Sequence, residues 1–470
     1  MLIITNKQSG TILVVVLVIT MLFISMATAL TGISFSEMRL YKQQTAKQQA
    51  LHIAEAGVNY YRWHLAHDQD DFQDGTGIAG PYTHDYTDPS NSMAGHFKLE
   101  ITPPPTGSTI VKIKSTGWVD EYPNSTRAVE VRYGIPSLAH FSFLTNADAW
   151  FGNNERVVGE MHSNGGVRMD GTNDSLVASS RQNYVCQSGH GCNTQATCHA
   201  PCSWSNPNCT CPGVWGVGLN SPLWSYPVVT VDFNSITADL NNLQSIAGVT
   251  LNTTGSNKGY HIIFKANGHF DAKLVSAVGN INQFDDTWTS WVNTPETITT
   301  EGIATDYTIP ANGVIFVNDG DVWVEGTVKG RVTLVAATLP DNVNKRRTIH
   351  IVNNLQYLAR DGTNVLGLIA QKNIKVVRGA PNNLIIDGVL LAQNGRVFHN
   401  RYNTASVKNS IEVYGSVLTN QTWTWSWVSG ASTIDGYKIT NSIYDPLLTY
   451  APPPSFPTTG QYAFISWEEK

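Results

Sequence analysis

The chain has 470 residues, enough for several domains that each bury a core of their own. Charged residues make up only 14% of it, the formal net charge is −6, and the densest basic run is Lys345-Arg346-Arg347. This charge pattern excludes the broad basic surface that nucleic-acid binding requires. Gly, Asn, Thr, Ser and Val are plentiful, which favours an exported, β-rich protein over a cytosolic α/β enzyme.

The first feature along the chain is a stretch without charged side chains between Lys7 and Glu37. About 25 of its residues form an apolar run, enough to cross a bilayer as a helix. Residues 36–68 contain no proline, and small or apolar positions recur there at steps of three or four, which forms one stripe along a helix. The sequence therefore predicts one helix over 11–67, roughly 85 Å long. The stripe positions are Ala46, Ala50, Ile53, Gly57, Tyr61 and Leu65.

The ten residues before this helix resemble the leader of a prepilin, because they end in Gly10 and the apolar helix begins at once with Thr11. That resemblance implies cleavage between Gly10 and Thr11. Two alternatives remain: a secretory signal peptide cut after Ala27-Thr28-Ala29, and an uncleaved anchor. The helical continuation beyond residue 30 favours the prepilin interpretation, since a signal peptide does not need it.

The segment from Ala50 to Asn59, with its Ala54-Glu55-Ala56-Gly57 core, resembles the N-terminal region of PilX-type pilus-assembly proteins. The resemblance covers roughly residues 1–70. It implies a single-pass membrane protein with an extracytoplasmic head, whose partners are the membrane, other pilin-like subunits and a prepilin peptidase. Major pilins carry Glu at the fifth mature position, and Val15 stands there in this chain. The resemblance therefore implies an accessory or minor component of a type IV pilus or related secretion filament, acting in assembly or surface adhesion.

Residues 68–137 are expected to form a pilin-like head on the back half of the helix, giving an α+β N-terminal part. A polar loop leads to three segments that alternate apolar and polar side chains between Pro- and Gly-containing turns, and these predict an antiparallel meander. The three segments are 95–102, 108–119 and 125–133.

Residues 138–443 contain many short segments rich in Val, Ile and Leu, each followed by a Gly, Asn or Asp corner. This punctuation predicts an all-β domain, a parallel β-solenoid, and a sandwich is the alternative because no strict repeat is visible. A helix is expected at 234–246. Stretches within 159–171, 313–337, 365–378 and 384–400 resemble an envelope domain of unknown function that often follows a PilX-like N-terminus. Residues 444–470 are expected to be a Pro-rich C-terminal strap on the surface.

All cysteines lie within one predicted insertion, 181–225, and their even number in an exported chain favours disulfides. Zinc binding with His190 and His199 is the alternative, but the spacings contain no CxxC knuckle. The pairing stays open among fifteen arrangements. The cysteines are Cys186, Cys192, Cys198, Cys202, Cys209 and Cys211.

Three tryptophans, Trp423, Trp425 and Trp427, would share one face of a strand. They either stack on surface glycans or cover the core. Glu160 with His162, and Asp319 with Asp321, are the candidate catalytic pairs, but both lie in corners where such side chains order turns. No catalytic or nucleotide-binding motif accompanies them. We therefore expect no catalysis, no cofactor and no metal. The alternatives to a pilus component are a membrane-tethered carbohydrate-active β-helix enzyme and a self-associating envelope scaffold.

Overall fold

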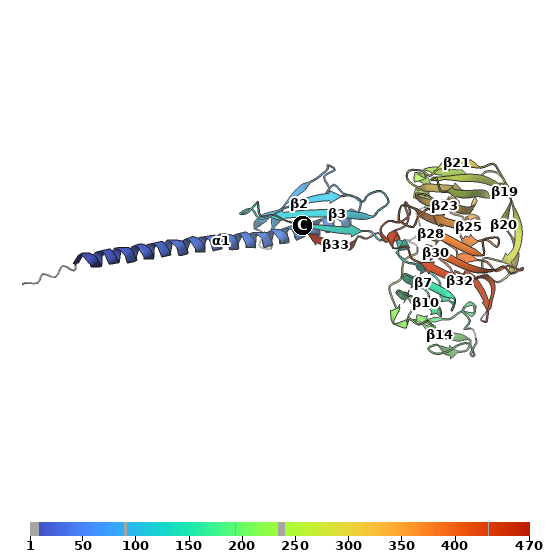
Figure 1. Ribbon diagram of the computed structural model, residues 1–470. Coiled ribbons are helices and arrows are strands. Elements are labelled where there is room, and N and C mark those ends of the chain that lie inside the picture. The colour runs from blue at the N-terminus through green and yellow to red at the C-terminus, as the bar shows by residue number, and fades with distance from the viewer. Residues whose placement is uncertain (1–8, 89–91, 193, 234–239, 431) are drawn as a thin grey trace, which may run out of the picture. The chain divides into compact units, whose positions relative to one another are not determined.

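The structure is a computed structural model that describes all residues except 1–8, 89–91, 193, 234–239 and 431 (Figure 1). The predicted leader and the first part of the predicted helix 234–246 thus fall largely outside the described residues. The chain divides into two compact units. The head unit comprises Met1–Pro104, Ile110–Gly134 and Tyr462–Lys470, and the β unit comprises Pro105–Thr109 and Ile135–Gln461.

The head unit consists of one helix and one sheet. Helix α1 runs without a break over Ser9–His67, which confirms the predicted single helix. The stripe is confirmed as well, because all six of its positions are buried. They pack on a five-stranded sheet in the order β1-β2-β3-β4-β33. The strands are β1 (Tyr82–Thr87), β2 (Met93–Thr102), β3 (Ile110–Trp118), β4 (Arg127–Gly134) and β33 (Ala463–Glu469).

The predicted meander corresponds to β2, β3 and β4, which pair antiparallel. Two strands were not predicted. Strand β1 lies in the segment that the sequence assigned to a polar loop. Strand β33 pairs antiparallel with β4. The strap prediction is therefore wrong for 463–469, because this segment forms an edge strand of the head sheet.

The helix and the head sheet approach each other most closely at two glycines. A Cβ atom on Gly117 of β3 would lie 2.3 Å from the Ala50 carbonyl oxygen and 2.6 Å from the Ala54 nitrogen. A Cβ atom on Gly57 would lie 2.4 Å from Ser115 Oγ. Gly57 is the glycine of the PilX-like motif, so the motif marks the place where the helix crosses the sheet.

The β unit is dominated by a 22-stranded sheet. Its first half contains β5 (Phe143–Thr145), β7 (Glu155–Val158), β8 (Met161–Ser163), β10 (Thr172–Asn173), β11 (Val177–Ser179), β16 (Trp224–Ser225), β17 (Val249–Asn252), β18 (Gly259–Lys265), β19 (His269–Phe284), β20 (Trp291–Glu301) and β21 (Thr305–Thr308). Its second half contains β22 (Val314–Asn318), β23 (Asp321–Val328), β24 (Arg331–Ala337), β25 (Ile349–Tyr357), β26 (Val365–Ala370), β27 (Ile374–Val376), β28 (Asn383–Ala392), β29 (Val397–His399), β30 (Val407–Thr419), β31 (Ser426–Ser429) and β32 (Ser432–Ile443).

Most of these strands form long parallel ladders, such as β22-β24-β26-β28-β30 and β18-β23-β25-β27-β29. Pairs that involve β19 or β31 are antiparallel, so the sheets of the chain are mixed. In one ladder Phe316, Val335, Ile369, Leu391 and Leu418 follow each other in register. Unequal lengths of chain separate them, which explains why the sequence shows no strict repeat.

The core of the β unit lies between these ladders, where Ile351, Leu368 and Val376 are fully buried. A second apolar cluster joins the ladder of Phe316 to Leu240 and Leu243 of helix α2 (Leu240–Ile246). Pro452, Pro453 and Phe456 are also buried, so the Pro-rich part of the C-terminal segment packs closely against the β unit.

Short elements complete the β unit. Two sheets have three strands each, β12-β14-β13 and β15-β9-β6. Their strands are β6 (Ala149–Phe151), β9 (Val167–Met169), β12 (Asn183–Val185), β13 (Ser203–Ser205), β14 (Asn208–Pro212) and β15 (Val214–Trp215). The 3₁₀ turns are Leu138–His140, Ser188–His190, Ser221–Leu223, Val343–Lys345 and Pro446–Thr449.

Candidate functional site

The front half of α1 is the largest apolar surface that the structure describes. From Ile12 to Tyr41 its large apolar side chains are exposed, with Phe23 at 74% and Leu30 at 60%. By length and composition this helix can cross a membrane, and it lies near the N-terminus. Water does not tolerate a contiguous apolar surface of this size, so lipid or other apolar helices must cover it. The chain is thus compatible with a single-pass membrane protein.

A groove at the foot of this apolar helix was not predicted from the sequence. It has a volume of about 640 Å³ and lies between α1 and the loops of the head sheet. Lys42, Gln49 and His52 line it from the helix, and Asp88, Asp120 and Glu121 line it from the loops. Lys42 Nζ lies 3.7 Å from Glu121 Oε1. The groove brings residues distant in the sequence together, so no local pattern could have revealed it.

The cysteine-rich insertion is stapled by three disulfides, as the cysteine count predicts. The pairs are Cys186–Cys192, Cys198–Cys209 and Cys202–Cys211. Their sulfur atoms form a small core with Tyr184 and Trp215. Because every cysteine is in a disulfide, the insertion offers no thiolate for zinc.

An arginine holds this insertion to the strand beneath it. The Arg168 guanidinium lies between the rings of Trp150 and Trp215, 4.9 and 5.0 Å from their centroids. It also donates a 2.6 Å hydrogen bond to the carbonyl of His190. Burial and the nearby Arg168 charge lower the pKa of His190 to about 4, so this imidazole is neutral at physiological pH.

The tryptophan row does not form the exposed sugar-stacking surface that the sequence suggested as one option. Trp423 and Trp425 are only 4% and 1% exposed and pack in the main core with Phe143 and Phe151. The glycan-binding prediction is therefore wrong for these two side chains, because a sugar cannot reach them. Trp427 lies elsewhere: it is partly exposed, and its ring meets Phe284 and Trp288.

Of the candidate catalytic residues, His162 lies in strand β8 and Asp321 begins strand β23, and both take part in short hydrogen-bond networks. His162 Nε2 lies 3.0 Å from Asn164 Oδ1 and 3.3 Å from Ser180 Oγ. Burial lowers the pKa of His162, against the opposing effect of the Asn164 hydrogen bond. Asp321 Oδ1 accepts a 3.0 Å hydrogen bond from the Thr348 backbone N–H, which joins two neighbouring strands.

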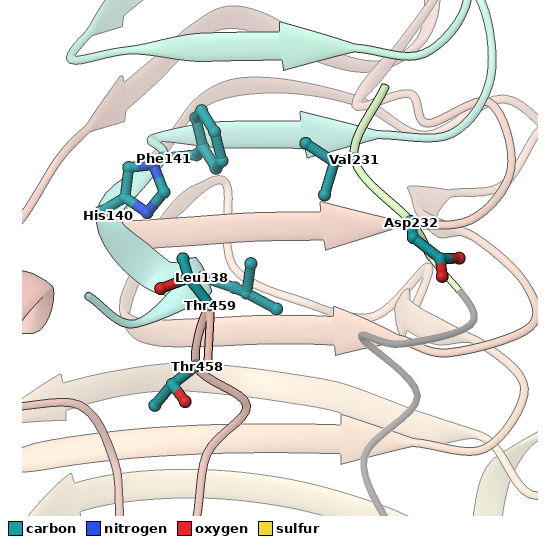
Figure 2. Close-up of a pocket in the computed structure, with 7 residues that line it drawn as sticks. All are labelled: Leu138, His140, Phe141, Val231, Asp232, Thr458 and Thr459. Carbon is teal, nitrogen blue, oxygen red and sulfur yellow. The ribbon is translucent and has the colours of Figure 1, made fainter. Parts of the chain in front are cut away.

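A small pocket of about 290 Å³ lies near His162, whose ring centroid is 5.7 Å from that of the lining residue Phe141 (Figure 2). Its lining includes Leu138, Phe141 and Val231, with His140 and Asp232 as titratable groups. Figure 2 shows these two groups at opposite ends of the pocket, so they do not form an acid–base pair. His140 Nδ1 is also held 2.7 Å from the Ser137 carbonyl.

No family model matches the chain, and no curated protein matches it. Among solved structures, it shows similarity to the competence-associated pilin ComZ from Thermus thermophilus. The identity is 14%, the match covers 91% of this chain and 98% of that chain, and the TM-score is 0.32. A likeness this distant carries no argument about function.

Proposed function

We propose that this chain is a pilin-like envelope protein that acts as an accessory or minor component of a type IV pilus or a related secretion filament. One observation carries the proposal. A single helix, Ser9–His67, has an exposed apolar front half and a back half whose stripe packs on an antiparallel head sheet. An apolar helix that continues as the spine of a folded head can leave the lipid and pack among similar helices without refolding the head.

The N-terminal residues support processing as a prepilin and an accessory role. A prepilin peptidase cleaves between Gly10 and Thr11, and Val15 takes the place of the usual Glu, which suits an accessory role better than that of a major subunit. Other pilin-like subunits are the partners of the apolar helix. The groove beside Lys42 and Glu121 lies where such a neighbour would meet the head.

The β unit would then be the part presented outside the cell for assembly or adhesion. Its long parallel ladders and the core between them support a β-solenoid. Disulfides in the insertion support an extracytoplasmic location, because such bonds persist in oxidising compartments. We propose that it acts by binding and assembly and not by catalysis.

The test is the mature N-terminus of the protein isolated from its native membrane, determined by mass spectrometry. A start at Thr11, particularly an N-methylated one, is the expected result. A start at Leu30 would mean ordinary export and would refute the filament role, and an intact Met1 would indicate a simple anchored protein.

A matched pair of variants sharpens this measurement. Gly10→Val should abolish the Thr11 terminus if the leader is read at the cleavage site. Gly32→Val lies in the same helix, where an added Cβ meets nothing within 4 Å, and should leave the terminus unchanged. Equal processing of both variants would contradict the proposed cleavage.

A further inference from the structure

Residues 276–301, called the covering hairpin here, lie over one parallel ladder of the β unit. They comprise the end of β19 and the whole of β20, which Figure 1 shows as long strands on the outer side of this unit. From Val275 onward β19 pairs with β20, and near the tip of the hairpin β19 adds two backbone hydrogen bonds to the chain beneath. These join Phe284 N to Arg401 O and Asn403 N to Asn282 O.

The ladder under the hairpin carries a row of rings and cationic groups. His261, Trp323, His350, Lys375 and Phe398 are successive in-register partners on β18, β23, β25, β27 and β29. Their neighbours in sequence, such as Ile351 and Val376, point into the core, so the row faces outward. At about 4.8 Å per strand, the row is roughly 19 Å long. The Trp323 and His350 rings are stacked at 5.0 Å.

The hairpin meets this outward row with polar groups. Gln283 and Glu296 are the only buried side chains among residues 276–301, all of which the structure describes. An amphipathic strand that was built only to cover a core would bury apolar side chains there. The hairpin contains Asp285, Asp286, Glu296 and Glu301 and no Lys, Arg or His. It is therefore an acidic cover on a face that carries His261, His350 and Lys375, where Glu325 of β23 also lies 3.0 Å from His261.

Glu296 is the centre of the contact. Its carboxylate pairs with the buried Lys375 ammonium, accepts a 2.9 Å hydrogen bond from the Tyr402 hydroxyl and accepts a 2.8 Å hydrogen bond from the Arg378 backbone N–H. Three donors from the ladder side thus converge on one carboxylate. Such a set of donors is a binding site for a carboxylate, and the hairpin fills it from the same chain.

Two further hairpin carboxylates pair with side chains of the strands beneath or of the loops that precede them. Glu301 Oε2 is 2.8 Å from His261 Nδ1 at one end of the row. Asp286 Oδ2 is 2.5 Å from Nζ of Lys372, three residues before Lys375, and the Asp286 carbonyl accepts a hydrogen bond from Arg396. Between the carboxylates lie flat rings that suit sugar stacking. Trp427 belongs to them, since the Trp288 ring of the hairpin tip covers it at 5.0 Å.

We propose that the ladder face under the covering hairpin is a binding site for a carboxylate-bearing polysaccharide, a polyuronate, and that the hairpin occupies this site until the ligand displaces it. A polyuronate carries one carboxylate on each sugar ring, so it can replace the hairpin carboxylates on the same donors while its rings stack on Trp323, Phe398 and Trp427. The proposal does not require the chain to enter a filament.

The experiment measures binding of polygalacturonate to the full chain in detergent, with neutral dextran and single-stranded polythymidylate as comparison polymers. Wild type is expected to bind polygalacturonate weakly. Glu296→Gln removes the carboxylate with little change in shape and is expected to bind at least tenfold more tightly. The double variant Glu296→Gln/Lys375→Met keeps the hairpin unanchored but lacks the cation, and it should lose that gain.

Hydrogen exchange of residues 277–298 reports opening of the hairpin independently, and it should be faster in Glu296→Gln. The matched control is Asp306→Asn, which removes a paired carboxylate on β21 outside the hairpin and should change neither readout. Several results would overturn the proposal: unchanged exchange in Glu296→Gln, faster exchange without tighter polygalacturonate binding, an equal gain for dextran or polythymidylate, or a gain that survives Lys375→Met.

Discussion

Replacing Gly117 by Ala tests whether helix α1 and the head sheet form one closely packed body. The added Cβ would lie 2.3 Å from the Ala50 carbonyl oxygen, 2.6 Å from the Ala54 nitrogen and 3.1 Å from the Ile53 carbonyl carbon. All three atoms belong to helix backbone, which cannot rotate away as a side chain can. The helix must therefore move outward by about 1 Å to reach ordinary contact distances, which forfeits a quarter to a half of the dispersion energy of each contact it loosens.

Overpacking of this kind costs about 1–3 kcal/mol, and the rigid neighbours place Gly117→Ala at the upper end. For a unit of this size the loss corresponds to a decrease in melting temperature on the order of 10 °C. The assay is thermal unfolding of the full chain in detergent, combined with hydrogen exchange of β2, β3 and β4 to assign the effect to the head unit. The same substitution at Gly152, where an added Cβ meets nothing within 4 Å, is the matched control.

Gly57→Ala provides an internal comparison. Its Cβ would meet Ser115 Oγ at 2.4 Å and the Phe97 ring at 2.7 Å, and both are side chains that can adjust. The substitution also gains up to about 1 kcal/mol of helix propensity. We therefore expect a smaller loss than for Gly117→Ala. Two results would refute this reasoning. One is a melting temperature of Gly117→Ala within about 1–2 °C of wild type, which is roughly the scatter of such measurements. The other is a greater loss of stability for Gly57→Ala than for Gly117→Ala.

Three further outcomes are expected. Removal of the Cys198–Cys209 disulfide as a double Ser variant should cost roughly 3 kcal/mol locally and speed proteolysis within 183–212, while melting of the rest of the β unit stays unchanged, because the insertion has its own core. Trp425→Ala should destabilise the β unit by about 3–5 kcal/mol, as a fully buried core ring does on truncation, and a loss below about 1 kcal/mol would contradict its core position. Burial and the nearby Lys408 charge lower the pKa of His399 to about 3, so the unfolded chain takes up a proton near pH 6.5 that the folded chain does not. The free energy of unfolding of wild type, measured by urea titration relative to His399→Phe, should therefore fall by about 1.4 kcal/mol per pH unit as the pH decreases from 6.5 towards 3. Parallel pH profiles of the unfolding free energy for the two proteins would contradict this.

The elements that the sequence predicted well are those that bury apolar side chains at a regular period. The stripe from Ala46 to Leu65 has a period of three to four and is buried as expected. Strands such as Val314–Asn318 and Val365–Ala370 are rich in Val, Ile and Leu because side chains on both of their faces are buried. The disulfides followed from an even cysteine count, but their pairing depends on the register of β12, β13 and β14, which no spacing rule contains.

The elements that were missed lack this regular apolar signal. Strand β1 alternates only between half-buried and exposed residues, and β33 is separated from its partner β4 by more than 300 residues. The three tryptophans gave a clear signal in the sequence, but that signal had two possible meanings. Its residue types suit both a sugar platform and a core, and only the packing of Phe143 and Phe151 against Trp423 decides between them.

The covering hairpin, which occupies the proposed binding site, was also not predicted from the sequence. Strand β20 buries a single side chain, Glu296, and its other residues give no apolar face that a periodicity argument could detect. Its partner on the ladder, Lys375, is flanked by the core residues Ile374 and Val376, so the sequence there predicts an ordinary buried strand. An isolated buried Lys or Glu is strongly unfavourable, and only the pair makes both tolerable. Neither residue is interpretable alone, and such a pair stabilises a fold only weakly compared with apolar packing, which suits the displaceable contact proposed for the hairpin.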